Sequence, residues 1–252
     1  MDLHLKDKVV IVTGGGRGIG RMIAVTFAQE GAKVVVADLY AERAQAVCKE
    51  IVAGGGQAIA LGTDVTKMEE ARKLAEAALT TYGRIDALVN NAGAWAVKLF
   101  DDLTPADWER EINVNYYGTI NCVKAVMAQM VQQHGGSIVN LGSDAGRIGD
   151  YMQSTYSGAK GAVISFSKGL AKEVGKHGIR VNAVCPSGTM TEGVQEVGMI
   201  NERTIDRVLK AYPLRKLGKP EDVANMVVFV ASDRAGQVTG QAISVNGGYS
   251  TA

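Results

Sequence analysis

The sequence has little of what marks several classes of protein. Its three cysteines are far apart with no C-x-x-C spacing, and its three histidines are scattered. A disulfide framework, a zinc knuckle and a metal centre are therefore not expected. Lys and Arg number 27 against 26 for Asp and Glu, a balance that argues against a partner such as nucleic acid or an anionic membrane. No run reaches the roughly 18 apolar residues of a membrane helix, and the charged N-terminus differs from a signal peptide. We expect a cytoplasmic protein.

What the sequence does have is glycine and a regular alternation of segments. Thirty-one glycines with only four prolines indicate tight turns and close backbone approaches. Short β-branched runs alternate with longer segments of helical periodicity, which predicts parallel strands joined by right-handed crossovers. The predicted strands are 8–13, 33–38, 57–61, 86–90, 137–141, 179–184 and 242–245. The predicted helices are 19–30, 41–53, 67–82, 105–131, 155–176 and 221–232. The expected fold class is α/β: one doubly wound, Rossmann-type domain over 1–252, with a seven-stranded parallel sheet flanked by helices.

A glycine-rich turn follows the first predicted strand and leads directly into a helix. Its sequence is T-G-G-G-R-G-I-G over residues 13–20. Glycines let the main chain approach a pyrophosphate closely, and a helix N-terminus offers free N–H groups. Asp38, 18 positions beyond Gly20, ends the second strand, where a carboxylate hydrogen-bonds an adenosine ribose diol. These features together predict a dinucleotide site.

A second group of residues indicates acid–base chemistry. Tyr156 and Lys160 are four positions apart on a predicted helix and therefore project from one face. A free tyrosine has a pKa of about 10, and Lys160 together with a positive nicotinamide ring is expected to lower it to about 7. A tyrosine with such a pKa can act as a general base and, in the reverse direction, as a general acid. Ser143, thirteen positions before Tyr156, would hold the substrate oxygen.

In these motifs the sequence resembles the short-chain dehydrogenase/reductase family, over essentially all of its length. The T-G-x-x-x-G-x-G turn, N-N-A-G at 90–93, the Tyr156-x-x-x-Lys160 motif and the Ser-to-Tyr spacing carry the resemblance. It implies hydride transfer between a nicotinamide cofactor and an alcohol or ketone, in a homotetramer. It also implies that Lys160 binds the nicotinamide ribose and that Asn115 anchors a water in a proton relay.

The glycine turn and the resemblance together define the predicted site. The predicted catalytic residues are Asn115, Ser143, Tyr156 and Lys160. The predicted cofactor-binding residues are Gly14, Arg17, Gly18, Ile19, Gly20, Asp38, Leu39, Asp64, Val65, Asn91, Ala92, Gly93, Tyr156, Lys160, Pro186, Ser187, Gly188, Thr189 and Thr191. Two positions depart from the family pattern. Ser187 replaces the usual glycine beside the nicotinamide, and Asn246 replaces a commoner aspartate, where we expect only a turn hydrogen bond to change.

NAD is the expected cofactor, because Asp38 would repel a 2′-phosphate and Leu39 offers no compensating cation. Two alternatives stay open. Arg17 could reach a 2′-phosphate, which would suit an NADP-dependent carbonyl reductase. A regulator that senses NAD(H) without turnover belongs to a different class, but it would not need the catalytic residues together.

The segment at about 187–212 is long and irregular, and we expect it to act as a substrate lid. Its apolar residues are Met190, Val194, Val197, Met199, Ile200, Ile205, Val208 and Leu209. With Trp95 and Tyr151 on the opposite wall, they predict a small or medium secondary alcohol, or its ketone, with a substantial apolar portion. Alternatively, the apolar residues pack on the body or on a neighbouring subunit. A further alternative is that Arg147 receives an anionic substituent of the substrate.

Overall fold

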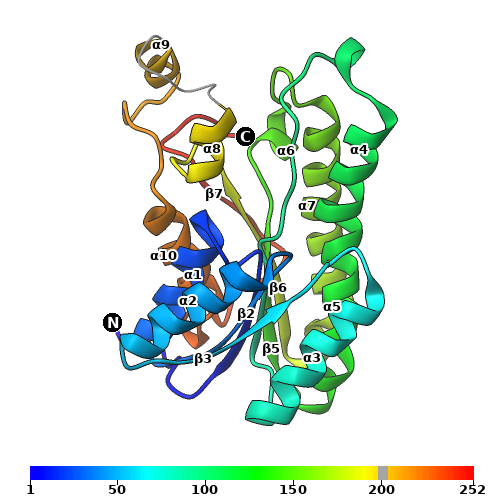
Figure 1. Ribbon diagram of the computed structural model, residues 1–252, viewed down its shortest axis with the longest axis vertical. Helices are drawn as coiled ribbons and strands as arrows, with labels where there is room; N and C mark the ends of the chain where they lie inside the picture. The colour runs from blue at the N-terminus through cyan, green and yellow to red at the C-terminus, as the bar shows by residue number, and fades with distance from the viewer. Residues whose placement is uncertain (198–203) are drawn as a thin grey trace.

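The protein is described by a computed structural model covering residues 1–197 and 204–252. Its centre is a sheet of seven parallel strands in the order β3-β2-β1-β4-β5-β6-β7 (Figure 1). The strands are β1 (Val9–Thr13), β2 (Lys33–Asp38), β3 (Gln57–Gly62), β4 (Ala87–Asn90), β5 (Gly136–Leu141), β6 (Ile179–Pro186) and β7 (Ala242–Val245). The winding direction reverses between β1 and β4, which makes this the doubly wound sheet expected from the sequence. The predicted fold class is confirmed.

Helices cover both faces of the sheet. The described helices are α1 (Gly18–Gln29), α2 (Ala41–Ala53), α3 (Met68–Tyr82), α4 (Pro105–Ile112), α5 (Gly118–Gln132), α6 (Ala145–Ile148), α7 (Ser154–Val174), α8 (Glu192–Val197), α9 (Ile205–Lys210) and α10 (Pro220–Ala231). One core lies between the sheet and the layer of α1, α2 and α10, and the other between the sheet and the layer of α3, α5 and α7 (Figure 1). Because helices cover both faces, the sheet is open at the two ends of its parallel strands, the amino-terminal end and the carboxyl end.

Burial on both faces explains the apolar strand sequences. In β1, Val10 and Val12 enter the core under α1 and α10, whereas Val9 and Ile11 enter the core under α3 and α5. All five residues of β1 are buried. A parallel strand with helices on both sides therefore reads as a continuous apolar run and not as an alternation.

A π-helical turn interrupts the helix predicted for 105–131. Thr104 and Asp107 cap the start of α4 with reciprocal hydrogen bonds, and α4 ends at Ile112. The π-helical turn spans Asn113–Tyr117 before α5 begins. The prediction of one uninterrupted helix is wrong here. Such wider turns are frequent at functional sites, and this one contains a residue of the predicted catalytic set.

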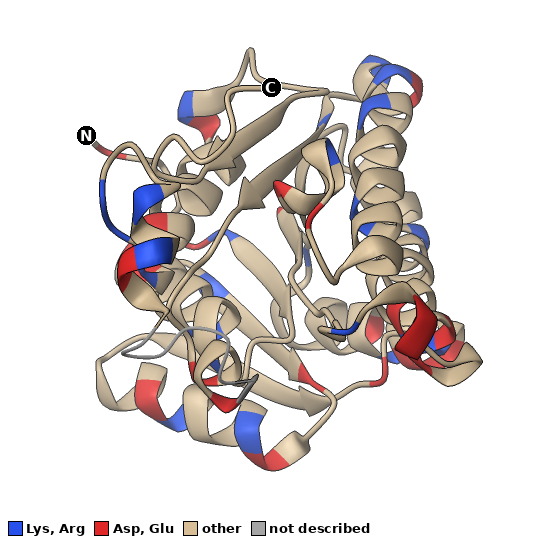
Figure 2. Cartoon of the chain, turned by 90° about the horizontal axis from the view of Figure 1, so that it is seen from above, with Lys and Arg blue, Asp and Glu red and all other residues tan. Residues whose placement is uncertain are grey.

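The carboxyl ends of the strands form the edge where the predicted site residues lie. Figure 1 shows α8 and α9 beyond this edge, above α1. Seen from above in Figure 2, positions of both charges are interspersed along the helices, while the central strands carry few. Over 1–197 and 204–252, we find no helix with the length and apolarity needed to span a membrane.

Candidate active site

The glycine-rich turn is held against the end of β4. Gly14 and Gly18 have φ angles of +59° and +53°, a region that favours glycine. The Asn91 amide donates to the carbonyl oxygens of Thr13 (3.0 Å) and Gly14 (2.9 Å). A Cβ on Gly20 would lie 2.0 Å from the Gly14 oxygen, so the first turn of α1 presses directly on the loop. This bare backbone is the cradle that a pyrophosphate requires.

Asp38 lies beside this cradle at the end of β2. Its carboxylate accepts hydrogen bonds from the N–H groups of Gly16 (2.9 Å) and Tyr40 (3.1 Å). The side chain of the next residue, Leu39, is exposed. Each carboxylate oxygen keeps a further lone pair, so Asp38 is fixed in place and still able to accept from a ligand. The residues present therefore fit the adenosine end of a nicotinamide cofactor.

Four further predicted residues lie along the same edge. Asp64 accepts from the Thr66 N–H (3.0 Å) and hydroxyl (2.7 Å). Val65 is buried and contributes to the core beneath α3 and α5. The Ala92 N–H donates to the hydroxyl of Thr13 at 3.2 Å, and Gly93 follows in the same loop. The structure thus brings these positions to one end of the sheet, next to the glycine turn.

Arg17 pairs with the segment predicted to form the lid. Its Nη1 lies 3.0 Å from a carboxylate oxygen of Glu196 on α8. The side chain of Arg43, which the sequence reasoning missed, begins beside Asp38, and its guanidinium lies 4.3 Å from the centre of the Tyr40 ring. A Cβ on Gly16 would meet both the Arg43 Cβ (2.6 Å) and Asp38 Oδ2 (2.7 Å). The sequence could have indicated Arg43, because it lies in the first turn of α2, five positions after Asp38.

The structure brings Ser143, Tyr156 and Lys160 together. Ser143 follows β5, whereas Tyr156 and Lys160 lie on α7. The Ser143 hydroxyl lies close enough to the Tyr156 hydroxyl to lower the pKa of that tyrosine. The Lys160 Nζ lies 5.8 Å from the centre of the Tyr156 ring and donates to the Leu141 carbonyl at 2.6 Å. Ser143 Oγ accepts from the Ala145 N–H at 3.1 Å, which fixes the hydroxyl at the mouth of the site.

Burial opposes the ionisation of both central groups. It raises the pKa of Tyr156 to about 12 and lowers that of Lys160 to about 8. The nearby Ser143 hydroxyl lowers the pKa of Tyr156, but this effect is smaller than that of burial. Lys160 alone therefore does not bring the Tyr156 pKa toward neutrality, and the lowering expected from the sequence depends on the positive ring of an oxidised cofactor.

Asn115 occupies the π-helical turn and is 1% exposed. Its amide donates to the carbonyl oxygens of Ala94 (2.6 Å) and Glu111 (2.9 Å). Its Oδ1 is buried without a hydrogen-bond partner among the described residues. A Cβ on Gly93 would lie 3.0 Å from this oxygen and 3.8 Å from Lys160 Nζ. A buried acceptor beside Lys160 can take a hydrogen bond from a ligand.

The segment after β6 crosses from the sheet to the lid. Pro186 ends β6, and its carbonyl accepts a hydrogen bond from the N–H of Asp144 at 3.0 Å. The hydroxyl of Ser187 donates to the carbonyl of Asn246 at 3.4 Å. The Gly188 N–H donates to the hydroxyl of Tyr212 at 3.0 Å. Thr189 is buried. This segment thus ties the end of the sheet to the end of the predicted lid.

Two short helices, α8 and α9, lie in the segment predicted to form a lid, and α9 is amphipathic. A Cβ on Gly193 of α8 would lie 3.3 Å from the ring of Trp95, and the Thr191 side chain lies as close as 3.4 Å to the Cβ position of Gly18. The apolar residues of α9 are partly buried and its charged residues exposed: Ile205, Val208 and Leu209 against Asp206, Arg207 and Lys210. Met199 and Ile200 lie outside the described residues. Tyr151, expected opposite the lid, is 77% exposed.

Asp144 is a buried carboxylate that the sequence reasoning missed. It is 0% exposed and accepts from the Ser244 hydroxyl (2.7 Å) and from the Asn246 amide. Arg147 Nη1 donates to the same Ser244 hydroxyl at 2.6 Å. Asn246 keeps a turn hydrogen bond, accepting from the Gly248 N–H at 2.9 Å. The expectation that Asn246 affects only a turn is therefore wrong, because its amide also stabilises a buried charge.

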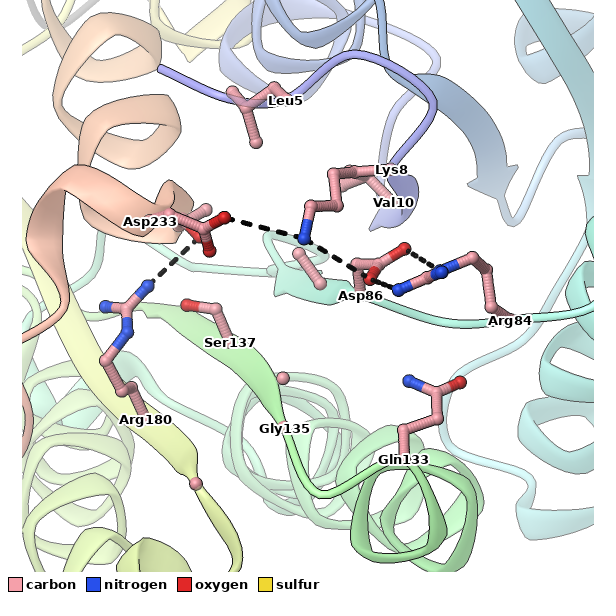
Figure 3. A pocket seen from close by; sticks show the side chains of 14 residues that line it. Leu5, Lys8, Val10, Arg84, Asp86, Gln133, Gly135, Ser137, Arg180 and Asp233 are labelled. Carbon is pink, nitrogen blue, oxygen red and sulfur yellow. Dashed lines mark hydrogen bonds and ion pairs between the residues drawn. The ribbon is translucent and has the colours of Figure 1, made fainter.

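A separate cavity lies at the amino-terminal ends of the strands (Figure 3). The charged side chains in it face one another. Lys8 Nζ lies 3.5 Å from Asp233 and 3.9 Å from Asp86, and Arg84 pairs with Asp86 at 2.6 Å. Arg180 donates to backbone carbonyls after α10. Ligands of open α/β sheets bind at the opposite, carboxyl edge, so we assign this cluster a structural role.

Comparison with known proteins agrees with the geometry at the carboxyl edge. A family model described as Enoyl-(Acyl carrier protein) reductase matches residues 14–250. The chain is 40% identical to 2-(S)-hydroxypropyl-CoM dehydrogenase 3 of Xanthobacter autotrophicus, over 98% of each chain. The chain belongs to the short-chain dehydrogenase/reductase family. It is accordingly an oxidoreductase that transfers hydride between a nicotinamide cofactor and an alcohol or ketone.

Other family members differ widely in substrate. The 3-oxoacyl-[acyl-carrier-protein] reductase FabG of Thermotoga maritima is 37% identical over 98% of this chain and 99% of that protein. A solved structure of 7 alpha-hydroxysteroid dehydrogenase, complexed with NADH and 7-oxo glycochenodeoxycholic acid, has a TM-score of 0.93 at 36% identity and covers 98% of this chain and 96% of that one. Family membership therefore fixes the reaction and not the molecule.

Proposed function

We propose that this chain is an NAD-dependent dehydrogenase of secondary alcohols, or the corresponding ketone reductase, with Tyr156 as the general acid–base. The observation that carries the proposal is the meeting of Ser143, Tyr156 and Lys160 at the same sheet edge as the glycine turn and Asp38. The intact set speaks against a regulator that binds NAD(H) without turnover, since cofactor binding alone does not need an acid–base pair.

The residues divide the work of the reaction. A bound NAD would supply the hydride acceptor, its nicotinamide ring. The Ser143 hydroxyl donates to the substrate oxygen and stabilises alkoxide character there. Tyr156 takes the hydroxyl proton in oxidation and returns it in reduction. Lys160, fixed by Leu141, favours the phenolate and holds the nicotinamide ribose, while Asn115 offers its buried Oδ1 to the proton relay.

The proposal of NAD over NADP rests on charge. The Asp38 carboxylate, fixed by two backbone N–H groups, would face and repel a 2′-phosphate. The alternative, an NADP-dependent carbonyl reductase, is favoured by Arg43, whose side chain begins beside Asp38. The ratio of kcat/KM with NAD(H) to that with NADP(H) separates the two, and we expect it to be well above one.

Replacement of the catalytic tyrosine tests the mechanism. Tyr156→Phe keeps the ring but removes the proton donor, so turnover should fall by about 10²–10⁴-fold. NADH binding, measured by fluorescence titration, should stay close to normal. Tyr82→Phe on the distant helix α3 is the matched control and should keep full activity. A Tyr156→Phe enzyme with a tenth of the wild-type rate would refute the assignment. Cofactor binding without turnover of any alcohol or ketone would favour the regulator.

We propose a small or medium alcohol or ketone with an apolar portion as substrate. The partly buried apolar residues of α9 and the contact of Trp95 with α8 support an apolar cover. Arg147 is engaged by Ser244 and by the Ala242 carbonyl (3.4 Å), which disfavours its use as an anion receptor. In a ketone series of rising chain length, kcat/KM should rise with length. A strict requirement for a terminal carboxylate, lost in Arg147→Ala, contradicts this substrate class.

The proposal includes a domain that spans 1–252, with a lid over 187–212, in a cytoplasmic homotetramer. Exposed large apolar side chains before, at the end of and just after α4 support self-association. They are Leu99 (46% exposed), Phe100 (66%), Ile112 (37%) and Tyr117 (53%). Sedimentation equilibrium should give four times the chain mass of 26.6 kDa. A monomer at assay concentration would remove the tetramer from the proposal without affecting the reaction.

A further inference from the structure

Glu111 is a buried carboxylate in the last turn of α4 and belongs to no predicted site. It is 1% exposed, although its position on an amphipathic helix gives no sign of burial. No ion pair among the described residues includes it. Burying a charge without a cation is costly unless hydrogen bonds satisfy the charge. The hydrogen-bond partners of Glu111 therefore indicate what the residue does.

Its partners join three segments of the active site. Oε1 accepts from the N–H of Ala96 at 2.6 Å, and Oε2 accepts from the hydroxyl of Thr155. The main-chain oxygen of Glu111 accepts from the amide of Asn115 at 2.9 Å. Thr155 directly precedes Tyr156 in the first turn of α7, which lies beside α4 in Figure 1. One residue therefore connects the loop after β4, the π-helical turn and the start of α7.

We propose that Glu111 is a positioning residue, which fixes the first turn of α7 and with it the Tyr156 hydroxyl relative to Asn115 and the 94–96 loop. The proposal rests on the role of Tyr156 proposed above. A misplacement of about 1 Å can cost roughly 10²-fold in rate, so a tether one residue from the general acid–base affects turnover. The side chain itself touches neither substrate nor cofactor.

The charge of Glu111 also acts on the tyrosine. The groups that face Tyr156 are Lys160 on its own helix, Glu111 from α4, Asp150 from the preceding loop and Cys185 from β6. The negative charges of Glu111 and Asp150 add to burial in raising the Tyr156 pKa. Removal of the Glu111 charge should therefore make the phenolate easier to form, an effect that a purely structural residue would not have.

Variants at both ends of the tether separate position from charge. Glu111→Gln keeps the size but removes the charge, and the pH at which kcat/KM for alcohol oxidation reaches half its maximum should fall by about half a unit to one unit. Thr155→Val keeps the shape but removes the donor, and kcat should fall about tenfold without that shift. Thr155→Ser keeps the hydroxyl and should restore the rate. Glu109→Gln, an exposed neighbour on α4, is the matched control.

Melting temperature and NADH affinity are measured for every variant. A pH profile and kcat of Glu111→Gln equal to those of Glu109→Gln would overturn the proposal. So would parallel losses of stability and rate in Glu111→Gln and Thr155→Val with no change of pH profile and no rescue by Thr155→Ser. If Glu111→Gln does not fold, the Thr155→Val and Thr155→Ser pair still decides. Tyr156→Phe tests the general acid–base separately, so failure of that role is distinguishable from failure of the tether.

Discussion

Replacement of Asn246 by aspartate should destabilise the protein by placing two carboxylates face to face. In the wild type the Asn246 amide donates to the buried Asp144 carboxylate and to the Ser250 carbonyl (2.7 Å). Aspartate keeps the acceptor for the Gly248 N–H but removes both donations. Asp144, already 0% exposed, would then face a second negative charge, and among the described residues the Ser244 hydroxyl would be the one side-chain donor left to it.

The magnitude follows from the two losses. A hydrogen bond to a charged group is worth about 1.5–3 kcal/mol, and a buried polar group left without its partner costs about 1–3 kcal/mol. Because one carboxyl can take up a proton instead, we expect a net loss of about 2–4 kcal/mol. For a chain of this size that corresponds to a fall in Tm of roughly 5–15 °C.

The expected pH dependence has a definite sign. Facing carboxylates raise the folded-state pKa of one of the pair above its unfolded value of about 3.9. The shared proton stabilises the variant at low pH, and this stabilisation is lost as pH rises through the raised pKa. The Tm deficit of Asn246→Asp should therefore be larger at pH 8 than at pH 5, by differential scanning calorimetry at both pH values.

The exchanged pair supplies the control. Asp144→Asn with Asn246→Asp again pairs an amide with a carboxylate, and it should recover more than half of the lost Tm, so the two changes should be strongly non-additive. Recovery is incomplete because Ser250 loses its donor. An unchanged Tm in Asn246→Asp at pH 8, or an exchanged pair no more stable than the sum of the single losses, would refute the reasoning.

Three further predictions concern the cofactor cradle, the loop before α10 and the tyrosine. Asp38→Ser with Leu39→Arg should shift the kcat/KM ratio toward NADP(H), with Leu39→Arg alone as the control; an unchanged ratio contradicts the role of Asp38. Arg215 has a φ angle of +52°, a left-handed conformation that costs residues other than glycine about 1–2 kcal/mol. Arg215→Gly should therefore raise the Tm by a few degrees. A fall in Tm would show that the hydrogen bond from Arg215 to the Lys210 carbonyl (2.9 Å) contributes more to stability than the backbone strain costs. Because burial raises the Tyr156 pKa, the rate of alcohol oxidation should rise from pH 7 to 9, whereas the rate of ketone reduction should not. Steady-state rates measured in both directions test this prediction. An oxidation rate that falls over that range would contradict it.

The sequence predicted those parts of the fold and site that depend on local patterns. β1 and β2 are largely apolar runs, and Asp38 stands at a characteristic spacing of 18 positions from the glycine turn, so local pattern and spacing alone indicated that these elements form one unit. Glu111 could not be found this way, because its burial results from the packing of α4 against α7 and not from the pattern of α4. Asp144 and Asn246 are separated by 102 positions, and only the sheet order that places β7 beside β6 brings them together.

Tyr156 and Lys160 lie one turn apart on α7, and their burial works against the ionisation of both side chains. It raises the pKa of the tyrosine to about 12 and lowers that of the lysine to about 8, so the protein alone favours the neutral phenol. A neutral phenol is a ready proton donor for ketone reduction, whereas alcohol oxidation needs a phenolate and therefore a further positive charge close by. The hydrogen bonds of Lys160 to Leu141 and of Asn115 to Ala94 thus fix positions, not charge states. In the mechanism proposed above, the fold would therefore fix the geometry, and an oxidised cofactor would supply the positive charge that lowers the Tyr156 pKa.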